Sequence, residues 1–168
     1  IIAGVLYTVV GDVDASAMVG TGALTFNGAL ETDSKINITG GRGADILTGG
    51  SKADTIIGGY GADNITGGPG IDNLSGGAGG DTFTIATKAN FTLLTTAETV
   101  SGGSGSDTID ITDATGVSIT AADLINISSV EKIEFGGAGD DSIVLSDQVF
   151  TGNGATSIKI ENSAAGTM

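Results

Sequence analysis

The chain has 168 residues, including 30 Gly and a single Pro, and it contains no Cys, His or Trp. Its 20 acidic and 6 basic residues give a formal net charge of −14. The lack of His and Cys excludes Ser-His-Asp and Cys-His triads, zinc sites built on imidazole or thiolate, and disulfides. The acidic balance argues against a nucleic-acid partner, which requires clustered Lys and Arg, and favours divalent cations.

The N-terminal part of the chain, residues 1–35, is predicted to be a β-strand segment. Two short apolar runs, Val5 to Val10 and Ala23 to Phe26, are separated by glycines that favour tight turns. Residue 1 is Ile, and the opening residues lack the basic region of a secretory signal, so we expect a fragment of a longer protein. No apolar run approaches the roughly 20 residues that span a bilayer, so we expect no transmembrane segment.

A nine-residue repeat occupies the centre of the chain. Residues 40–84 read GGRGADILT, GGSKADTII, GGYGADNIT, GGPGIDNLS and GGAGGDTFT. Each block fits G-G-x-G-x-D-x-U-x, where U is a large apolar residue, except that Lys52 replaces a Gly in the second block. Isolated further copies begin at Gly102 and Gly136. A fixed period of this kind indicates a stacked repeat architecture.

Each block combines a turn and a strand. The first six residues are rich in Gly, which reaches positive φ, and the last three form a short strand whose middle residue points inward. Two blocks make one 18-residue coil, and successive coils stack as parallel sheets about 4.8 Å apart. We therefore predict an all-β fold, a parallel β-roll over residues 36–84. The inner rows are expected to be Leu47, Ile65 and Phe83 in one sheet, and Ile38, Ile56 and Leu74 in the other. The inclusion of Ile38 starts the roll one strand before the first full motif.

The aspartates of the repeat also stack, alternately on the two edges of the roll. Two unit charges one strand spacing apart repel by roughly 3–4 kcal/mol at an effective dielectric constant of 20. Arg42 and Lys52 are too few to neutralise the carboxylates, and Lys52 is expected to weaken the site between Asp54 and Asp72. Calcium bound by carboxylate and turn carbonyl oxygens satisfies both the charge and the carbonyls. Five tandem turns then give three interior sites.

The candidate ligands therefore form two sets. The side-chain ligands are predicted to be Asp45, Asp54, Asp63, Asp72, Asp81, Asp107 and Asp141. The backbone carbonyl ligands are predicted to be those of Gly41, Gly43, Gly59, Gly61, Gly68, Gly70, Gly77 and Gly79. Since a Gly-rich coil buries few side chains for its length, we expect Ca²⁺ binding to be coupled to folding.

The remainder of the chain is predicted to continue as β structure. Residues 85–101 are expected to form a capping loop beneath Phe83 or an irregular coil, and residues 102–168 a further β-helix with the isolated motifs. Twenty-six residues separate Asp81 from Asp107, one fewer than three periods, which leaves open whether the sixth motif continues the same stack. One helical turn is expected at Thr120 to Leu124, capped by Thr120.

The five tandem blocks resemble the RTX (repeats-in-toxin) nonapeptides. This resemblance implies a right-handed parallel β-roll, calcium bound between turns, and export by a bacterial type I system to the cell exterior. The segment from Ile127 to Phe135, together with the motif that follows it, resembles RTX-type bacterial surface-layer proteins, which are similarly acidic, rich in Thr, Ser, Ala and Gly, and free of Cys.

Two functions follow from these resemblances. The first is an extracellular calcium-binding structural module of a surface-layer or adhesin-like protein, with self-association into a surface lattice. The alternative is the C-terminal calcium-binding and secretion module of a type I-secreted enzyme or toxin. The continued β pattern after the tandem block favours the first. Glu131 and Glu134 are a conceivable acid-base pair on glycans, but we expect ordinary solvent-facing charges beside Lys132, and no enzyme.

Overall fold

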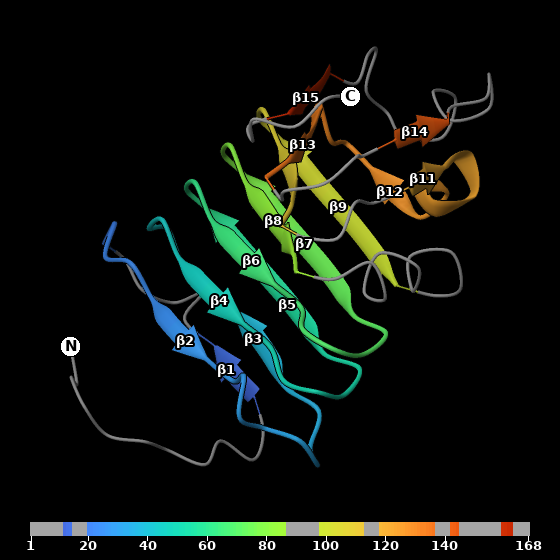
Figure 1. Ribbon diagram of the computed structural model, residues 1–168. Helices are drawn as coiled ribbons and strands as arrows, with labels where there is room; N and C mark the ends of the chain where they lie inside the picture. Colours follow the sequence, from blue (N-terminus) through green and yellow to red (C-terminus); the bar gives the residue numbers. More distant parts are fainter. Residues whose placement is uncertain are drawn as a thin grey trace.

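The computed structural model describes residues 12–14, 20–86, 98–112, 118–136, 142–144 and 159–162. Short parallel strands follow one another around a stack of coils, which runs from β1 and β2 at one end to β13 and β15 at the other (Figure 1). The predicted apolar run at residues 5–10 lies outside the described part of the chain. The fold is an all-β parallel β-roll, as the nine-residue period predicts.

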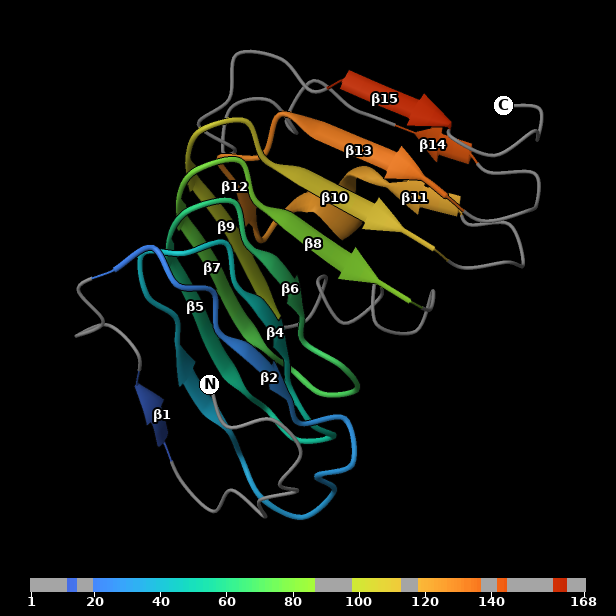
Figure 2. The ribbon, with the colours of Figure 1, turned by 90° about the vertical axis from the view of Figure 1, so that its left-hand side faces the viewer.

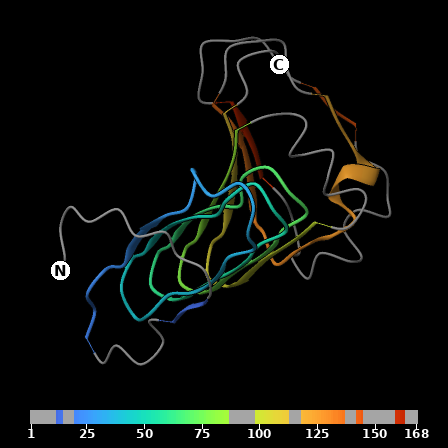
Figure 3. The same ribbon diagram turned by 90° about the horizontal axis from the view of Figure 1, so that it is seen from below.

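Two sheets form the long sides of the roll. The first sheet has six strands in the order β1 (Asp12–Asp14), β3 (Asn37–Thr39), β5 (Thr55–Tyr60), β7 (Asn73–Ala78), β9 (Thr99–Ser104) and β12 (Ile127–Ser128). The second has seven strands in the order β15 (Lys159–Asn162), β13 (Lys132–Phe135), β10 (Thr108–Ile111), β8 (Thr82–Ile85), β6 (Asn64–Thr66), β4 (Ile46–Thr48) and β2 (Thr25–Asn27). Figure 2 shows the strands of the second sheet side by side. Figure 3 looks along the stack and shows the turns that join the two sheets into successive coils.

The strand register confirms the predicted coil of two blocks. In the first sheet Ile38 pairs with Ile56, and Ile56 pairs with Leu74. In the second, Leu47 pairs with Ile65, and Ile65 pairs with Phe83. The predicted inner rows are therefore correct, because a period of two nonapeptides returns every apolar residue to the same position of the sheet.

The roll begins earlier than the motif pattern predicts. Strands β1 and β2, from the segment expected to be separate, pair with β3 and β4 in the same two sheets. Phe26 pairs with Leu47 and packs against the core, and the backbone N–H of Leu24 donates to the Asp45 carboxylate at 2.7 Å. An apolar side chain and a backbone donor thus extend the stack without the nonapeptide sequence.

The stack also continues past the tandem block. Strand β10 pairs with β8, so that Ile109 lies beside Phe83 and Ile111 beside Ile85. Strand β10 covers Phe83, and residues 99–101 belong to β9, so the described residues do not form the predicted cap; the alternative, an irregular coil, stays a prediction. The sixth motif joins the roll, since the backbone N–H of Asp81 donates to the Asp107 carboxylate at 2.8 Å. Residues 87–97 lie outside the described part.

Beyond β10 the coil gains a third side. A two-stranded sheet is formed by β11 (Ser118–Thr120), which follows β10, and β14 (Ser142–Val144), which follows β13. The strand of the seventh motif is β14, so it pairs with β11 and not with the tandem roll. The 3₁₀-helix η1 (Ala121–Leu124) follows β11, and the Asp123 carboxylate accepts a 2.6 Å bond from the Thr120 backbone N–H. The predicted helical turn is confirmed.

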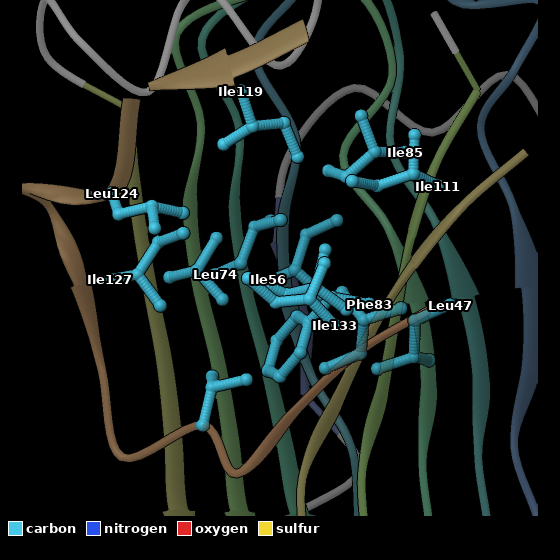
Figure 4. Close-up of a cluster of buried hydrophobic side chains, with 14 of the residues drawn as sticks. Leu47, Ile56, Leu74, Phe83, Ile85, Ile111, Ile119, Leu124, Ile127 and Ile133 are labelled. Atoms are coloured by element: carbon cyan, nitrogen blue, oxygen red, sulfur yellow. The ribbon is translucent and has the colours of Figure 1, made fainter. Parts of the chain in front are cut away.

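The core is a column of aliphatic and Phe side chains enclosed by the sheets. Leu47, Ile56, Leu74, Phe83 and Ile133 are each at most 1% exposed, and Figure 4 shows them directed toward one another between the strands. Burial of each such side chain contributes about 1.5–3 kcal/mol. Because this core fixes the two sheets against each other, the turns that connect them keep the same relative position in every coil.

Candidate metal centre

The repeat aspartates lie at the last position of their turns, directly before the next strand. We call the turns from the first sheet to the second the first edge, and the turns back the second edge. Asp45, Asp63, Asp81 and Asp107 lie on the first edge; Asp54 and Asp72 lie on the second. All six side chains are at most 2% exposed. The predicted division of the aspartates between two edges is thus observed in the register.

A hydrogen bond links each aspartate to the next along its edge. On the first edge the backbone N–H of one aspartate donates to Oδ1 of the next: Asp45 to Asp63 at 2.7 Å, Asp63 to Asp81 at 2.9 Å, and Asp81 to Asp107 at 2.8 Å. On the second edge Asp54 donates to Asp72 at 2.9 Å. Four stacked pairs result, one more than the tandem block alone predicts, because the Asp107 turn continues the first edge.

The second carboxylate oxygen, Oδ2, distinguishes the first aspartate of each edge from the aspartates that follow it. In Asp45 and Asp54 it accepts from the N–H of Gly41 at 2.8 Å and of Gly50 at 2.6 Å. In the other four it has no hydrogen-bond partner although it is buried. These oxygens are Oδ2 of Asp63, Asp72, Asp81 and Asp107. A buried, unpaired carboxylate oxygen costs about 1–3 kcal/mol or more, and a cation relieves that cost.

Burial perturbs the protonation of these aspartates. It raises the pKa of Asp63 and of Asp72 to about 6, with a further rise from the neighbouring carboxylates. The pKa values of Asp81 and Asp107 are raised for the same first reason. Hydrogen bonds from the preceding aspartate N–H groups oppose these rises without cancelling them. Without a cation, the interior disfavours the charged form that a metal would require.

The turns approach one another so closely that side chains do not fit. A Cβ on Gly58 would lie 2.6 Å from the carbonyl oxygen of Gly76 and closer still to Oδ2 of Asp63. Gly59 has φ +111°, where side chains are strained, and a Cβ there would be 2.5 Å from the carbonyl oxygen of Gly41. The glycines therefore bring carboxylate and carbonyl oxygens of successive coils together.

The predicted carbonyl ligands belong to the second and fourth positions of the repeat, where successive coils approach each other closely. The carbonyl oxygens of Gly43 and Gly61 approach the glycines one coil further on, Gly61 and Gly79. The carbonyl oxygen of Gly41 accepts from the N–H of Tyr60 at 2.9 Å. The remaining predicted carbonyls belong to the equivalent positions of the repeat: Gly59, Gly68, Gly70, Gly77 and Gly79.

The basic side chains of the tandem block do not neutralise the carboxylates. Arg42 lies over the Tyr60 ring, 5.4 Å from its centroid, and Lys52 is exposed. Within the described ranges, the ion pairs all involve Lys132 or Lys159, on the outer face of the second sheet. Lys52 therefore forms no ion pair with Asp54 there, and the expected weakening of that site has no contact to support it.

Calcium fits this set of donors. The groups are all oxygens, both charged and neutral, which is the ligand set that Ca²⁺ prefers. In the part of the chain that is described, no group of three or more acidic side chains gathers at one point. A calcium ion held here would consequently need turn carbonyls in addition to aspartates, as the sequence predicts.

Two glutamates occupy aspartate positions that the motif search misses. Glu98 precedes β9 as Asp72 precedes β7; it is 2% exposed, and its Oε2 has no hydrogen-bond partner. Glu131 precedes β13, and its Oε2 accepts from the Asp107 N–H at 2.8 Å, extending the first edge. A search for Glu in place of Asp, two residues before an apolar residue, finds both, and Glu98 lies nine residues before Asp107.

Two further predictions concern the C-terminal part. Asp141 lies outside the described residues. Glu131 and Glu134 do not act together: Glu134 pairs with Lys132 at 2.7 Å on the outer face of β13, as expected for solvent-facing charges, whereas Glu131 is directed to the first edge. The expectation that Glu131 is a surface charge beside Lys132 is therefore wrong, because its carboxylate completes a hydrogen bond of the ladder.

Comparison with protein families agrees with the geometry. The model of the RTX calcium-binding nonapeptide repeat matches in four copies, over residues 39–74, 66–84 and 95–110. Comparisons with the curated proteins and with solved structures found no match. No helix in the described residues has the length and apolar character needed to cross a membrane. The matched segments cover less than half of the chain; they are RTX calcium-binding nonapeptide repeats, and repeats of this type bind Ca²⁺.

Proposed function

We propose that this chain is an extracellular structural module of a bacterial surface-layer or adhesin-like protein, in which Ca²⁺ drives folding and assembly. The observation that carries the proposal is the row of buried carboxylates along each edge, which we call the two ladders; among them, four aspartates and Glu98 keep an oxygen without a hydrogen-bond partner. The repeats are a structural calcium-binding module, and these buried carboxylates support a role of the metal in folding.

The proposed ligands are the ladder aspartates and the turn carbonyls. Each ion lies between two successive turns and joins one coil to the next. Buried carboxylates without a countercharge destabilise the folded state. A bound calcium ion changes their contribution to the free energy of folding from unfavourable to favourable. The small core of each coil, essentially one apolar side chain per strand, makes this contribution decisive for the stability of the stack.

Two features support a structural assembly over the tail of a secreted enzyme. Strands β13 and β15 extend the second sheet beyond the nonapeptides, so the scaffold does not end with the calcium sites. Their outer face carries a charge ladder in which Lys132 pairs with both Glu134 and Glu161, at 2.7 and 3.5 Å. Solenoids of this kind grow by adding coils and present long regular surfaces. Export by a type I system into a calcium-rich exterior suits such a scaffold.

Circular dichroism tests the calcium requirement. We expect the chain to lose most of its β signal when calcium is removed with excess chelator and to regain it when calcium is restored. Magnesium at the same concentration serves as the control, because its smaller octahedral shell fits carbonyl-rich sites poorly. An unchanged spectrum after exhaustive chelation contradicts calcium-driven folding.

Native mass measurement of the intact protein tests the assembly. High-order sheets that dissociate in chelator are the expected result. A discrete monomer that carries a hydrolase or toxin domain contradicts the lattice and assigns the chain to the secreted-enzyme alternative, while leaving the calcium sites unaffected.

A further inference from the structure

The second edge contains a carboxylate that does not belong to a nonapeptide turn. Glu98 directly precedes β9, and Thr99 pairs with Asn73 in the neighbouring strand, so Glu98 lies beside Asp72. The Thr99 backbone N–H donates to the Asp72 carbonyl oxygen at 3.0 Å, which fixes this register. Glu98 is therefore the third carboxylate of the second edge, after Asp54 and Asp72.

The environment of Glu98 matches that of the repeat aspartates. Among the described residues, five buried side-chain oxygens lack a hydrogen-bond partner: Oδ2 of Asp63, Asp72, Asp81 and Asp107, and Oε2 of Glu98. Four of these belong to the calcium-binding repeat. The fifth is the only one contributed by a residue outside a G-G-x-G-x-D turn, and it is 2% exposed.

A purely structural role does not explain a glutamate at this position. A buried carboxylate that stabilises a fold by itself is normally hydrogen-bonded or ion-paired, because burial without a partner costs several kcal/mol. Burial and the Asp72 carboxylate together raise the pKa of Glu98 to about 8. Asp72, its neighbour, has an unpartnered oxygen of its own.

We propose that Glu98 is a calcium ligand that, with Asp72 and the carbonyls of the turn at residues 67–72, forms an additional site at the end of the second edge. This inference rests on the proposed calcium-dependent folding and extends it to a coil that lacks the repeat. The longer glutamate side chain supplies here the carboxylate that an aspartate supplies in the regular turns. The irregular coil thereby becomes bound to the roll by metal, as the regular coils are.

The test compares Glu98→Gln with the wild-type chain and with Glu134→Gln. Glutamine keeps the size of a neutral glutamate, whereas Glu134 lies on the outer face of β13 and pairs with Lys132, so it controls for the loss of one negative charge. Isothermal titration calorimetry counts the bound calcium ions, and urea denaturation with and without calcium measures stability. We expect Glu98→Gln to bind one ion fewer, to gain less stability from calcium, and to be no less stable than wild type without calcium. Glu134→Gln should bind as many ions as wild type.

The outcomes separate this inference from the proposed function. If the wild-type chain binds no calcium, the proposed function itself fails. If wild type and Glu98→Gln bind the same number of ions with the same affinities, only the Glu98 site is overturned. Should Glu98→Gln not fold, Glu98→Asp decides, because shortening a ligand by one methylene should change the affinity of one site at least threefold. Identical titrations for Glu98→Asp and wild type overturn the site.

Discussion

Acidification should stabilise the metal-free protein, and this prediction tests the electrostatics of the ladders directly. The perturbation is removal of calcium by exhaustive dialysis, followed by a change from about pH 8 to about pH 5. Burial raises the pKa of Asp63 and Asp72 to about 6 and that of Glu98 to about 8. In this interval the folded chain takes up protons that the unfolded chain does not bind, so the folded state gains stability as the pH falls.

The expected magnitude follows from these pKa values. Between about pH 8 and about pH 5, proton linkage contributes about 1 kcal/mol for each of Asp63 and Asp72 and about 3 kcal/mol for Glu98, or about 5 kcal/mol in all. The sign is that of carboxylates with a raised pKa. Their contribution is complete below about pH 4 and is lost as the pH rises through about 6 and about 8. This is a large fraction of the usual stability of a domain.

Saturating calcium should reverse the slope. Calcium binds the ionised carboxylates, so protons compete with it, and the metal-bound protein should gain stability as the pH rises over the same interval. Urea denaturation followed by circular dichroism measures both series; dialysis replaces chelators because a chelator's affinity for calcium itself depends on pH. If the metal-free chain is largely unfolded near pH 8, the same reasoning predicts that acid alone restores β signal.

Two results refute this reasoning. If the stability of the metal-free protein increases with pH, burial does not disfavour the ionised form of the ladder carboxylates in the folded state. Equal slopes with and without calcium show that calcium and protons do not compete for the same groups. The Glu98→Gln variant supplies the internal control, since it should remove the largest part of the metal-free slope.

Substitutions at three positions, two of them with a matched control, test other parts of the structure. Asp63→Asn should reduce the number of calcium ions counted by calorimetry, because Asp63 Oδ2 is buried without a partner, whereas Asp110→Asn on the outward face of β10 should not. Gly59→Ala should lower the free energy of unfolding in calcium by about 2 kcal/mol or more, because φ is +111° and the methyl group would lie 2.5 Å from a carbonyl oxygen; an unchanged urea midpoint contradicts it. Ile65→Ala should lower it by about 2–5 kcal/mol, and exposed Ile46→Ala by about 0.5 kcal/mol or less; equal effects would mean that the inner rows are wrongly assigned.

The tandem part of the fold could be predicted almost completely from the sequence. A period of nine residues, doubled to 18, returns Leu47 to the position of Ile65 and Asp45 to that of Asp63 in the next coil. Both the core rows and the carboxylate ladders are consequences of this arithmetic. The requirement for glycine follows equally, because stacked turns leave no space for a Cβ.

The irregular coils could not be predicted in this way. Asp107 lies 26 residues after Asp81, and Glu131 lies 24 residues after Asp107, yet both continue the first edge. Neither spacing is a multiple of nine, so no local pattern indicates that the strands pair. Glu98 was missed for a related reason: it replaces the motif aspartate at the end of a segment whose sequence resembles a surface loop.

The sequence by itself therefore determined the repeating unit, its inward and outward faces, and the oxygen ligands for calcium, because these depend on neighbours within one period. Only the tertiary structure decided where the stack starts and how it continues, since pairing of β2 with β4 or of β10 with β8 depends on residues far apart along the chain. Backbone hydrogen bonds between parallel strands require register but not sequence identity. For that reason a coil without the motif joins the roll and brings Glu98 to the side of Asp72.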